Sequence, residues 1–422
     1  MGGAAGHLAH LYDDVDLTFA QLGEALRGLA RGEVETFEKV DGQNLFFTWS
    51  VPTGELRTAR NPGDIRRGGM RPEEYAAKWR GHPAEAAFTE AFEAIRTAVA
   101  RCNPDDPTGI WGPDGDRWVN AEILHSAHPN MIQYTGSHIV LHNMQSARAP
   151  EESVAMAFRQ LLDAVAGARV HFGPGMTWHF RAPLPVDLTA HHRDGATEAR
   201  LRALVEAVEA LAPGRLPSAT VGAFITERLR AGEVGALRLA RSREALLIQR
   251  LLGLARGTPA SELTPLRDIK RGLDAGLGRR ISALATSSTY HRTITRAVAP
   301  LAQLVGDFGV ELLRGVHSRL VGCPEAEVGR LRGEVRQACE KLGKYEGRDS
   351  GRVAELLAEQ SERLGPLSNI TSTLEGVVFR YPPGRKRLYK LTGAFAPVNQ
   401  LVGRARRLGP SEAQVFHPLV YI

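Results

Sequence analysis

The pattern of apolar and polar positions changes three times along the chain. From residue 7 to residue 32, apolar side chains recur every three or four positions, which predicts one or two short helices. From 34 to 148, short β-rich runs alternate with turns. From 149 to 366, helical spacing dominates, and after 366 the β-rich runs return. The chain therefore combines a strand-rich part with a largely helical one.

The clearest local signal in the first strand-rich stretch is a hairpin. Residues 45–51 are rich in β-branched and aromatic side chains, a turn with Pro52 and Gly54 follows, and a second run covers 56–60. Further along, we expect one helix over 72–100. The next two runs, residues 117–124 and 137–142, predict strands.

The helical stretch contains one exception and ends at a typical stop signal. Residues 177–181 predict a strand within it, and the last helix is expected to begin near Asp349 and to stop at Gly365-Pro366. Beyond it, two runs separated by a Pro-Pro-Gly turn, 374–381 and 387–392, predict a second hairpin.

These elements predict an α/β fold with antiparallel sheets and flanking helices, split by a large and mostly helical insertion. The expected divisions are N-terminal helices (1–33), the first half of a strand-rich domain (34–148), the helical insertion (149–366) and the second half of that domain (367–422).

Composition supports a globular protein. Of 422 residues, 43% are hydrophobic and 24% charged, which argues against general disorder. No run reaches the roughly 18 apolar residues that cross a bilayer, and the N-terminus lacks a secretory pattern, so we expect a cytoplasmic protein. Three cysteines (Cys102, Cys323 and Cys339) are too few and too irregularly spaced for a disulfide framework or paired metal ligands.

The formal net charge of +6 is unevenly distributed. The stretch 228–296 holds 14 basic and 5 acidic residues, a balance that suits a polyanionic partner such as nucleic acid. The alternative is that these arginines simply cover solvated helix faces. The candidate nucleic-acid-binding residues are Arg228, Arg230, Arg241, Arg243, Arg279 and Arg280.

Only seven of the 53 basic residues are lysines, so arginine is the default cation of this chain. Lys39 ends an apolar strand and is followed by a turn with Asp41 and Gly42. Unlike arginine, lysine can act as a nucleophile, but only as the free amine, so we expect burial or neighbouring cations to lower the pKa of Lys39.

Five short segments, in a fixed order, carry a resemblance to a known superfamily. They are KVDG (39–42), ARNPG (59–63), VNAEI (119–123), LEGVV (374–378) and LYKL (388–391). Together they resemble the motifs of the covalent nucleotidyltransferases, which include ATP-dependent polynucleotide ligases and mRNA-capping enzymes. The resemblance implies a nucleotidyltransferase (adenylation) domain.

The resemblance also implies a chemistry. Lys39 would attack ATP to form a lysyl-AMP intermediate, and AMP would pass to the 5′-phosphate of a nucleic acid. Glu375 would support Mg²⁺, with Mn²⁺ as a substitute, because the candidate ligands are oxygens. The implied nucleotide-binding residues are Glu38, Asp41, Gly42, Arg60, Glu122, Glu375 and Lys390.

Two residues depart from the superfamily pattern, and RNA ligases tolerate the first of these departures. Asn44 stands where ligases often carry arginine, and Thr392 stands where a second lysine is usual, a charge that Lys386 or Arg387 could supply. Only 32 residues follow Lys390, so we expect no C-terminal OB-fold of the kind found in DNA ligases and capping enzymes.

Three stretches are also similar to uncharacterised ligase-like proteins of large tailed phages: residues 7–11, 119–125 and 389–400. Other interpretations stay open: a DNA ligase, a nucleotidyltransferase with a non-nucleic-acid acceptor, and a catalytically silent nucleic-acid-binding protein. His125, His128, His138 and His142 gather near the predicted active-site strands, but we interpret them as hydrogen-bonded core or rim residues rather than metal ligands.

Overall fold

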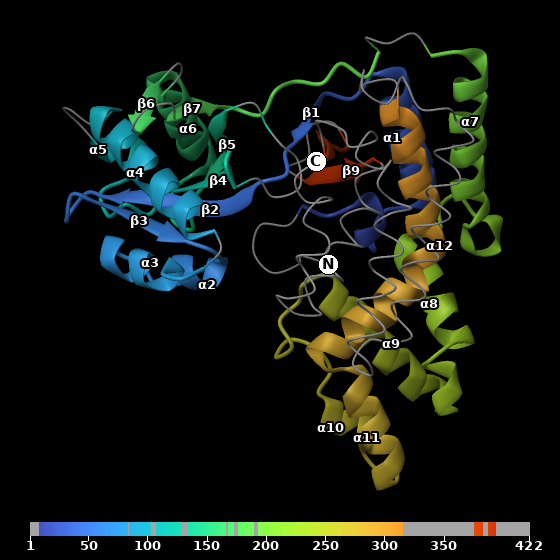
Figure 1. Cartoon of the computed structure of the whole chain (residues 1–422). Helices are drawn as coiled ribbons and strands as arrows, with labels where there is room; N and C mark the ends of the chain where they lie inside the picture. Colours follow the sequence, from blue (N-terminus) through green and yellow to red (C-terminus); the bar gives the residue numbers. More distant parts are fainter. Residues whose placement is uncertain are drawn as a thin grey trace, which may run out of the picture. The chain divides into compact units, whose positions relative to one another are not determined.

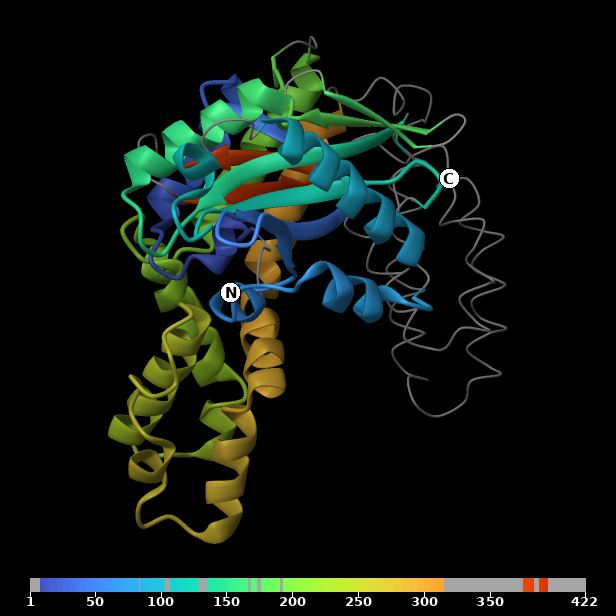
Figure 2. The ribbon, with the colours of Figure 1, turned by 90° about the vertical axis from the view of Figure 1, so that its left-hand side faces the viewer.

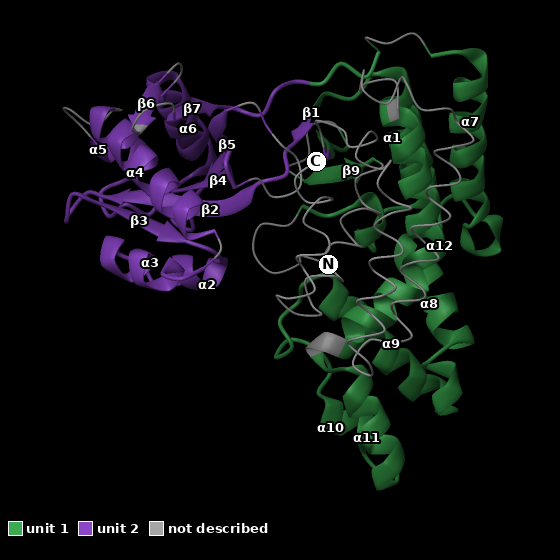
Figure 3. Cartoon of the chain, viewed as in Figure 1, with its two compact units in different colours: residues 1–37, 186–316, 376–393 green, residues 38–185, 317–375, 394–422 purple. Residues whose placement is uncertain are grey.

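The computed structural model describes residues 8–82, 84–102, 107–128, 134, 136–165, 168–172, 176–189, 193–314, 375–382 and 387–393. The chain divides into two compact units (Figure 3). The first comprises residues 1–37, 186–316 and 376–393, and the second residues 38–185, 317–375 and 394–422. The predicted helix at 349–366, Lys386 and residues 394–400 lie outside the described residues.

The second unit is built on a six-stranded mixed sheet (Figure 1). Its strands, in the order β3-β2-β4-β5-β7-β6, are β2 (Gln43–Ser50), β3 (Glu55–Ala59), β4 (Trp118–Leu124), β5 (Ser137–Gln145), β6 (Arg169–Phe172) and β7 (Met176–Arg181). All neighbours run antiparallel except β5 and β7, which are parallel. The first predicted hairpin is confirmed, because β2 and β3 pair in register across the turn at 51–54.

Helices cover one face of this sheet, as Figure 2 shows for α4 and α6. The helices of the unit are α2 (Pro62–Arg66), α3 (Pro72–Trp79), α4 (Glu85–Cys102), α5 (Pro107–Trp111) and α6 (Glu151–Val165). The core between α3, α4, α5, α6 and the sheet includes Leu45, Phe47, Phe88, Trp111 and Trp178. Helix α2 lies on the opposite face, where Ile65 packs against Phe46, Ala59 and Trp118. The other face of the sheet carries the polar residues described below.

The expected single helix over 72–100 is wrong in one respect, because it is two helices. α3 ends at Trp79 and α4 begins at Glu85. Gly81 between them has a φ of +76°, a left-handed conformation that ends a helix and that glycine adopts without strain.

The strand expected at 177–181 is present as β7, but the local pattern predicts neither its neighbour β6 nor the parallel pairing with β5. Because β6 and β7 extend the six-stranded sheet, residues up to 185 belong to its unit. The compact units thus divide the chain at 185/186, whereas the pattern of the sequence suggested a boundary at 148/149.

The first unit is mainly helical. Its elements are η1 (Leu11–Asp13), α1 (Phe19–Arg31), α7 (Gly195–Ala210), η2 (Pro213–Arg215), α8 (Val221–Ala231), η3 (Gly235–Leu237), α9 (Arg241–Ala255), α10 (Leu266–Lys270), α11 (Ala275–Leu284) and α12 (Ser287–Arg314). Helix α12, orange in Figure 2, packs against α7, α8, α9 and α11. Thr18 caps α1 by accepting a hydrogen bond from the Gln21 amide.

The second predicted hairpin is also confirmed. Strands β8 (Gly376–Arg380) and β9 (Leu388–Thr392) pair antiparallel, and β1 (Thr36–Lys39) lies next to β8. The N-terminal segment holds β9 in the first unit: the Lys390 amide donates to the carbonyl of Ala9, and the Tyr389 hydroxyl donates to buried Asp14 over 2.6 Å. None of the helices in the described ranges is long and apolar enough to span a membrane.

Candidate active site around Lys39

Lys39 is the last residue of β1, and its side chain is largely buried against Glu375. The Lys39 ammonium donates a hydrogen bond to the Glu375 carboxylate, and the Glu375 amide donates to the Lys39 carbonyl over 3.1 Å. The two side chains are only 17% and 11% exposed. Two segments that the sequence matched to separate motifs thus meet at both main chain and side chain.

The turn after Lys39 requires glycine. A Cβ on Gly42 would lie 2.6 Å from the carbonyl oxygen of Ile123 and 2.8 Å from Cγ of Glu122, closer than real contacts allow. This close approach lets the Gly42 amide donate to Glu122 Oε1 over 2.8 Å, while the Asp41 amide donates to the Tyr134 hydroxyl over 2.8 Å. The Lys-x-Asp-Gly sequence therefore places Lys39 beside the glutamate of β4.

Glu122 is held on its other side by His142. Their side chains lie 3.0 Å apart, from Glu122 Oε2 to His142 Nε2. Asn120 pairs with Asn143 and Ala121 with Leu141, so the ladder between β4 and β5 skips His142. A strand with one extra residue bends and redirects that residue. The bulge brings the His142 imidazole onto the Glu122 carboxylate.

Two asparagines continue this polar surface along the sheet. Asn44 lies opposite Glu122 in the register of β2 and β4, and its amide donates to the Asn120 side-chain oxygen over 2.7 Å. Asn120 and Glu122 are two residues apart in β4, so both lie on the face opposite the helices. The Oδ1 atom of Asn44 is buried and has no hydrogen-bond partner within the described residues, so it could accept one from a bound molecule.

Three carboxylates surround Lys39 and set its charge. Burial alone lowers the pKa of Lys39, but Glu375, Glu122 and Asp41 outweigh it and raise that pKa above its ordinary value. Burial raises the pKa of Glu375 to about 7, and Asp41 and Glu122 add to the effect against the opposing attraction of Lys39. The pKa of Glu122 is lowered, because the hydrogen bond from His142 and the charge of Lys39 overcome the cost of burial. The cluster thus holds more negative charge than Lys39 neutralises.

Glu38, predicted to bind nucleotide, forms its hydrogen bonds with other residues of the protein. It is 7% exposed, and its Oε1 accepts hydrogen bonds from the Arg181 guanidinium and, over 3.0 Å, from the Leu184 amide. The Arg181–Glu38 ion pair ties β7 to the residue before Lys39. Glu38 therefore anchors the strand that ends at Lys39.

Arg60, the other nucleotide-binding candidate of this unit, packs elsewhere. Its guanidinium lies 5.3 Å from the ring centroid of Trp79 and 4.8 Å from that of Phe88, both part of the helix-covered core. It donates a hydrogen bond to the main-chain carbonyl of Asn44. In this structure Arg60 thus stabilises the start of β2 from the side of the core.

Lys390 belongs to the first unit and lies in β9. Burial raises the pKa of Asp13 above its ordinary value, although the positive charge of Lys390 acts to lower it. The second unit therefore brings together Lys39, Asp41, Gly42, Glu122 and Glu375. Within the first unit, Lys390 lies beside the N-terminal segment.

The six basic candidates lie on helices of the first unit: α8, α9 and α11 each carry two. Arg230 forms an ion pair with Glu244 at 2.9 Å, Arg243 donates to the Arg271 carbonyl over 2.7 Å, and Arg280 donates to that of Ala236 over 3.4 Å. The other three, Arg228, Arg241 and Arg279, are exposed and have no hydrogen-bond or ion-pair partner in the described part of the chain.

The four histidines do not form one cluster. His125 is buried, and its Nε2 lies 3.1 Å from the Glu90 carboxylate. His138 lies beside His179 with ring centroids 5.3 Å apart. His142 forms a hydrogen bond with Glu122. Across the described residues, no group of three or more His, Cys, Asp or Glu side chains is arranged to hold a metal ion.

Sequence reasoning missed three members of the site. Tyr134 and Arg181 gave no local signal, and the sequence predicted His142 only as a hydrogen-bonded core or rim residue, not as a partner of Glu122. All three are placed by strand pairing or loop closure over separations of 20 to 143 residues.

Comparisons with protein families, with curated proteins and with solved structures found no match.

Proposed function

We propose that this chain is an ATP-dependent polynucleotide ligase of the RNA-ligase type, acting through a covalent lysyl-AMP at Lys39. The observation that carries the proposal is the pairing of Lys39 with Glu375 beside Glu122. A lysine in that setting can be a nucleophile whose proton has an immediate acceptor. The motif resemblance supports the proposal independently of the geometry, and on this view the six-stranded sheet belongs to a nucleotidyltransferase domain.

The residues suggest how Lys39 becomes reactive. The three carboxylates raise the pKa of Lys39 against the effect of burial, the reverse of the expected lowering, so Lys39 must lose a proton before attack. Glu375 is hydrogen-bonded to it and has a pKa of about 7, which suits a proton acceptor near neutral pH. The free amine then forms a P–N bond to the α-phosphorus of ATP, and the bond to pyrophosphate breaks.

The second half of the reaction regenerates the lysine. A nucleic-acid 5′-phosphate attacks the lysyl-AMP, the P–N bond breaks, and Lys39 recovers its proton. A 3′-hydroxyl then displaces AMP and joins the strands. Glu122, oriented by Gly42 and His142, is placed to accept hydrogen bonds from the ribose.

Among the described residues, no three acidic side chains are arranged as a ready metal site, so Glu375 would hold a divalent cation only together with oxygens of the bound nucleotide. Carboxylate oxygens are ligands that Mg²⁺ and Mn²⁺ prefer, and the negative charge of Glu375, Glu122 and Asp41 exceeds what Lys39 neutralises. Such an ion, when bound, would neutralise this charge together with that of the triphosphate.

The test is formation of the covalent adduct. The protein is incubated with Mg²⁺ and α-³²P-labelled ATP or GTP and resolved on a denaturing gel. We expect a labelled band with the wild type and none with Lys39→Arg. The matched control is Lys78→Arg, which keeps the ion pair that half-exposed Lys78 forms with Asp64 at 3.9 Å. Absence of a wild-type adduct with either nucleotide would overturn the proposal.

A chase identifies the acceptor. The labelled protein is mixed with nicked and single-stranded RNA and DNA, each carrying a 5′-phosphate. We expect transfer of AMP and strand joining, with RNA preferred. An adduct that never transfers to any strand would instead indicate a nucleotidyltransferase for another acceptor. Binding of strands without an adduct would indicate a silent nucleic-acid-binding protein.

A further inference from the structure

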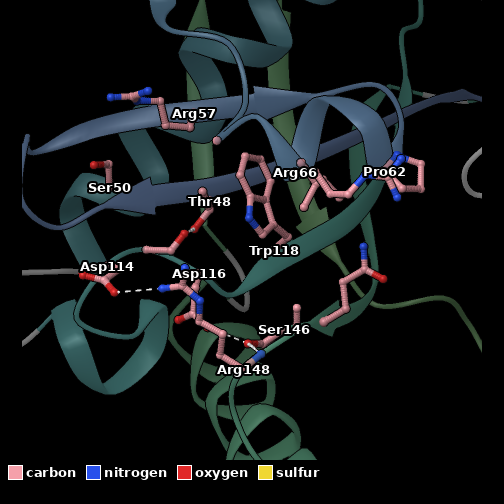
Figure 4. Close-up of a pocket in the computed structure, with 15 residues that line it drawn as sticks. Thr48, Ser50, Arg57, Pro62, Arg66, Asp114, Asp116, Trp118, Ser146 and Arg148 are labelled. Atoms are coloured by element: carbon pink, nitrogen blue, oxygen red, sulfur yellow. Dashed lines mark hydrogen bonds and ion pairs between the residues drawn. The ribbon is translucent and has the colours of Figure 1, made fainter.

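Figure 4 shows a pocket lined by residues of β2, β3 and β4. It lies on the same face of the six-stranded sheet as Glu122, at the other end of β2. Its volume is about 700 Å³. Thr48 and Trp118 line it, and each is an even number of residues from Asn44 or Glu122 on its strand, which places all four on one face. Thr48 is four residues from Asn44, or about 13 Å along the strand.

The pocket has an excess of positive charge. Arg57 of β3, Arg66 of α2 and Arg148 line it, together with Asp114 and Asp116. Both acids are already engaged, as the dashed lines of Figure 4 show: Asp114 pairs with Arg148 at 3.1 Å, and Asp116 accepts from the Ser146 hydroxyl over 2.6 Å. Three arginines against two aspartates leave the lining with one net positive charge.

Arg57 is the more constrained of the two. Its side chain is 16% exposed, and its buried Nε has no hydrogen-bond partner among the residues described. Its ion pair with Glu55 is loose, at 3.7 Å. Leaving a buried charged donor unbonded is costly, so such a group is expected to meet a ligand.

Arg66 complements it from the exposed rim of the pocket. Within the described ranges it has no hydrogen-bond or ion-pair partner. Two guanidinium groups at one pocket, with the Ser50 hydroxyl on the same wall, suit the oxygens of a phosphate group.

We propose that this pocket binds a backbone phosphate of the nucleic-acid strand whose end reacts at Lys39. The inference rests on the proposed ligase function. A separation of about 13 Å along the sheet corresponds to roughly four nucleotides at 3.4 Å per nucleotide. The pocket would hold the strand several nucleotides from the reacting end and so fix its direction across the sheet.

The test separates strand binding from adduct formation. Full-length Arg57→Gln, Arg66→Gln and the double variant are compared with Arg159→Gln, which removes an exposed arginine from α6. Binding of a fluorescent 5′-phosphorylated 12-mer RNA is measured by anisotropy over a salt series. We expect each pocket variant to bind about tenfold more weakly, with a salt slope reduced by about 0.7 per phosphate contact. We expect Arg159→Gln to match the wild type.

Self-adenylylation with labelled ATP is measured on the same variants, and we expect it to be unchanged because the pocket is remote from Lys39. Unchanged RNA binding by the double variant, with adduct formation intact, would overturn the pocket proposal and leave the ligase proposal standing. Binding of inorganic phosphate is measured on the same variants. Loss of phosphate binding without any loss of RNA binding would also overturn the pocket proposal, because the pocket would then bind a free anion rather than the strand. If Arg57→Gln fails to fold, exposed Arg66→Gln decides the matter alone.

Discussion

The Lys39 ammonium donates a hydrogen bond to the carboxylate of Glu375, a residue 336 positions further along the chain. Both side chains are largely buried, and Glu122 and Asp41 add negative charge around them. The pair therefore links a strand near the start of the chain to the segment that precedes β8. It also makes the protonation of this site sensitive to pH near neutrality.

The first prediction concerns the pH dependence of stability. Burial raises the pKa of Glu375 from 4.5 to about 7, so its proton stabilises the folded state below pH 4.5 and this contribution is lost as the pH rises through about 7. Relative to Glu375→Gln, the wild type should lose roughly 3 kcal/mol of unfolding free energy over that range. All five tryptophans (Trp49, Trp79, Trp111, Trp118 and Trp178) lie in the second unit, so urea unfolding followed by tryptophan fluorescence reports on that unit. A pH-independent difference between the two proteins would contradict this prediction.

Gly42 should not tolerate a side chain. In Gly42→Ala, the new Cβ meets the Ile123 carbonyl and the Glu122 side chain, so the turn must shift and lose its bond to Glu122. We expect a loss of about 3 kcal/mol in unfolding free energy and no lysyl adduct. The control is Gly54→Ala, where a Cβ meets nothing within 4 Å and only the positive φ of 64° costs about 1 kcal/mol. Equal losses in the two variants would show that the close approach at Gly42 is unimportant.

His142 should act as a positioning residue for Glu122. In His142→Leu the carboxylate loses a hydrogen bond that lowers its pKa, so the acidic limb of adduct formation should move to higher pH. We expect KM for ATP to rise about tenfold with little change in kcat, and His142→Gln to restore part of the affinity through its amide donor. His171→Leu, on exposed β6, is the control. A fall in kcat alone would assign His142 a different role.

Asp14 should be essential to the first unit. It is 4% exposed and accepts hydrogen bonds from the Tyr389 hydroxyl at 2.6 Å and from Arg387 at 2.8 Å. Asp14→Ala should cost about 3 kcal/mol, since it leaves the buried Tyr389 hydroxyl without its acceptor and breaks the ion pair with half-exposed Arg387, whereas Tyr389→Phe should cost about 1 kcal/mol. Circular dichroism at 222 nm during thermal unfolding measures both. Because the two residues share one bond, the double variant should cost less than the sum of the single variants.

The unpaired arginines of the helical unit should contribute to nucleic-acid binding. The triple variant Arg228→Gln, Arg241→Gln and Arg279→Gln removes three exposed charges that have no partner in the described residues. We expect the slope of log affinity against log salt for RNA to fall by about 2. Replacing the ion-paired Arg230 and Glu244 by glutamine leaves the net charge unchanged and should leave the slope unchanged. A slope that the triple variant does not alter would favour the alternative of solvated helix faces.

Local patterns in the sequence determined the elements whose information is contained in a few neighbouring residues. The hairpin of β2 and β3 follows from alternating β-formers around a Pro-Gly turn, and that of β8 and β9 follows in the same way. The glycine after Asp41 marked a turn for the same local reason. The order of the motifs predicted that Lys39, Glu122 and Glu375 belong to one site.

Only the tertiary structure decided how those residues meet. The bulge that turns His142 onto Glu122, the parallel pairing of β5 with β7 and the packing of Arg60 on Trp79 all depend on contacts between distant segments. Such contacts form where strand register and core packing are satisfied together, and neither is encoded by the spacing of one short stretch. The sequence by itself thus determined which side chains are available for chemistry, whereas the register of β4 with its neighbours decided which of them face Lys39.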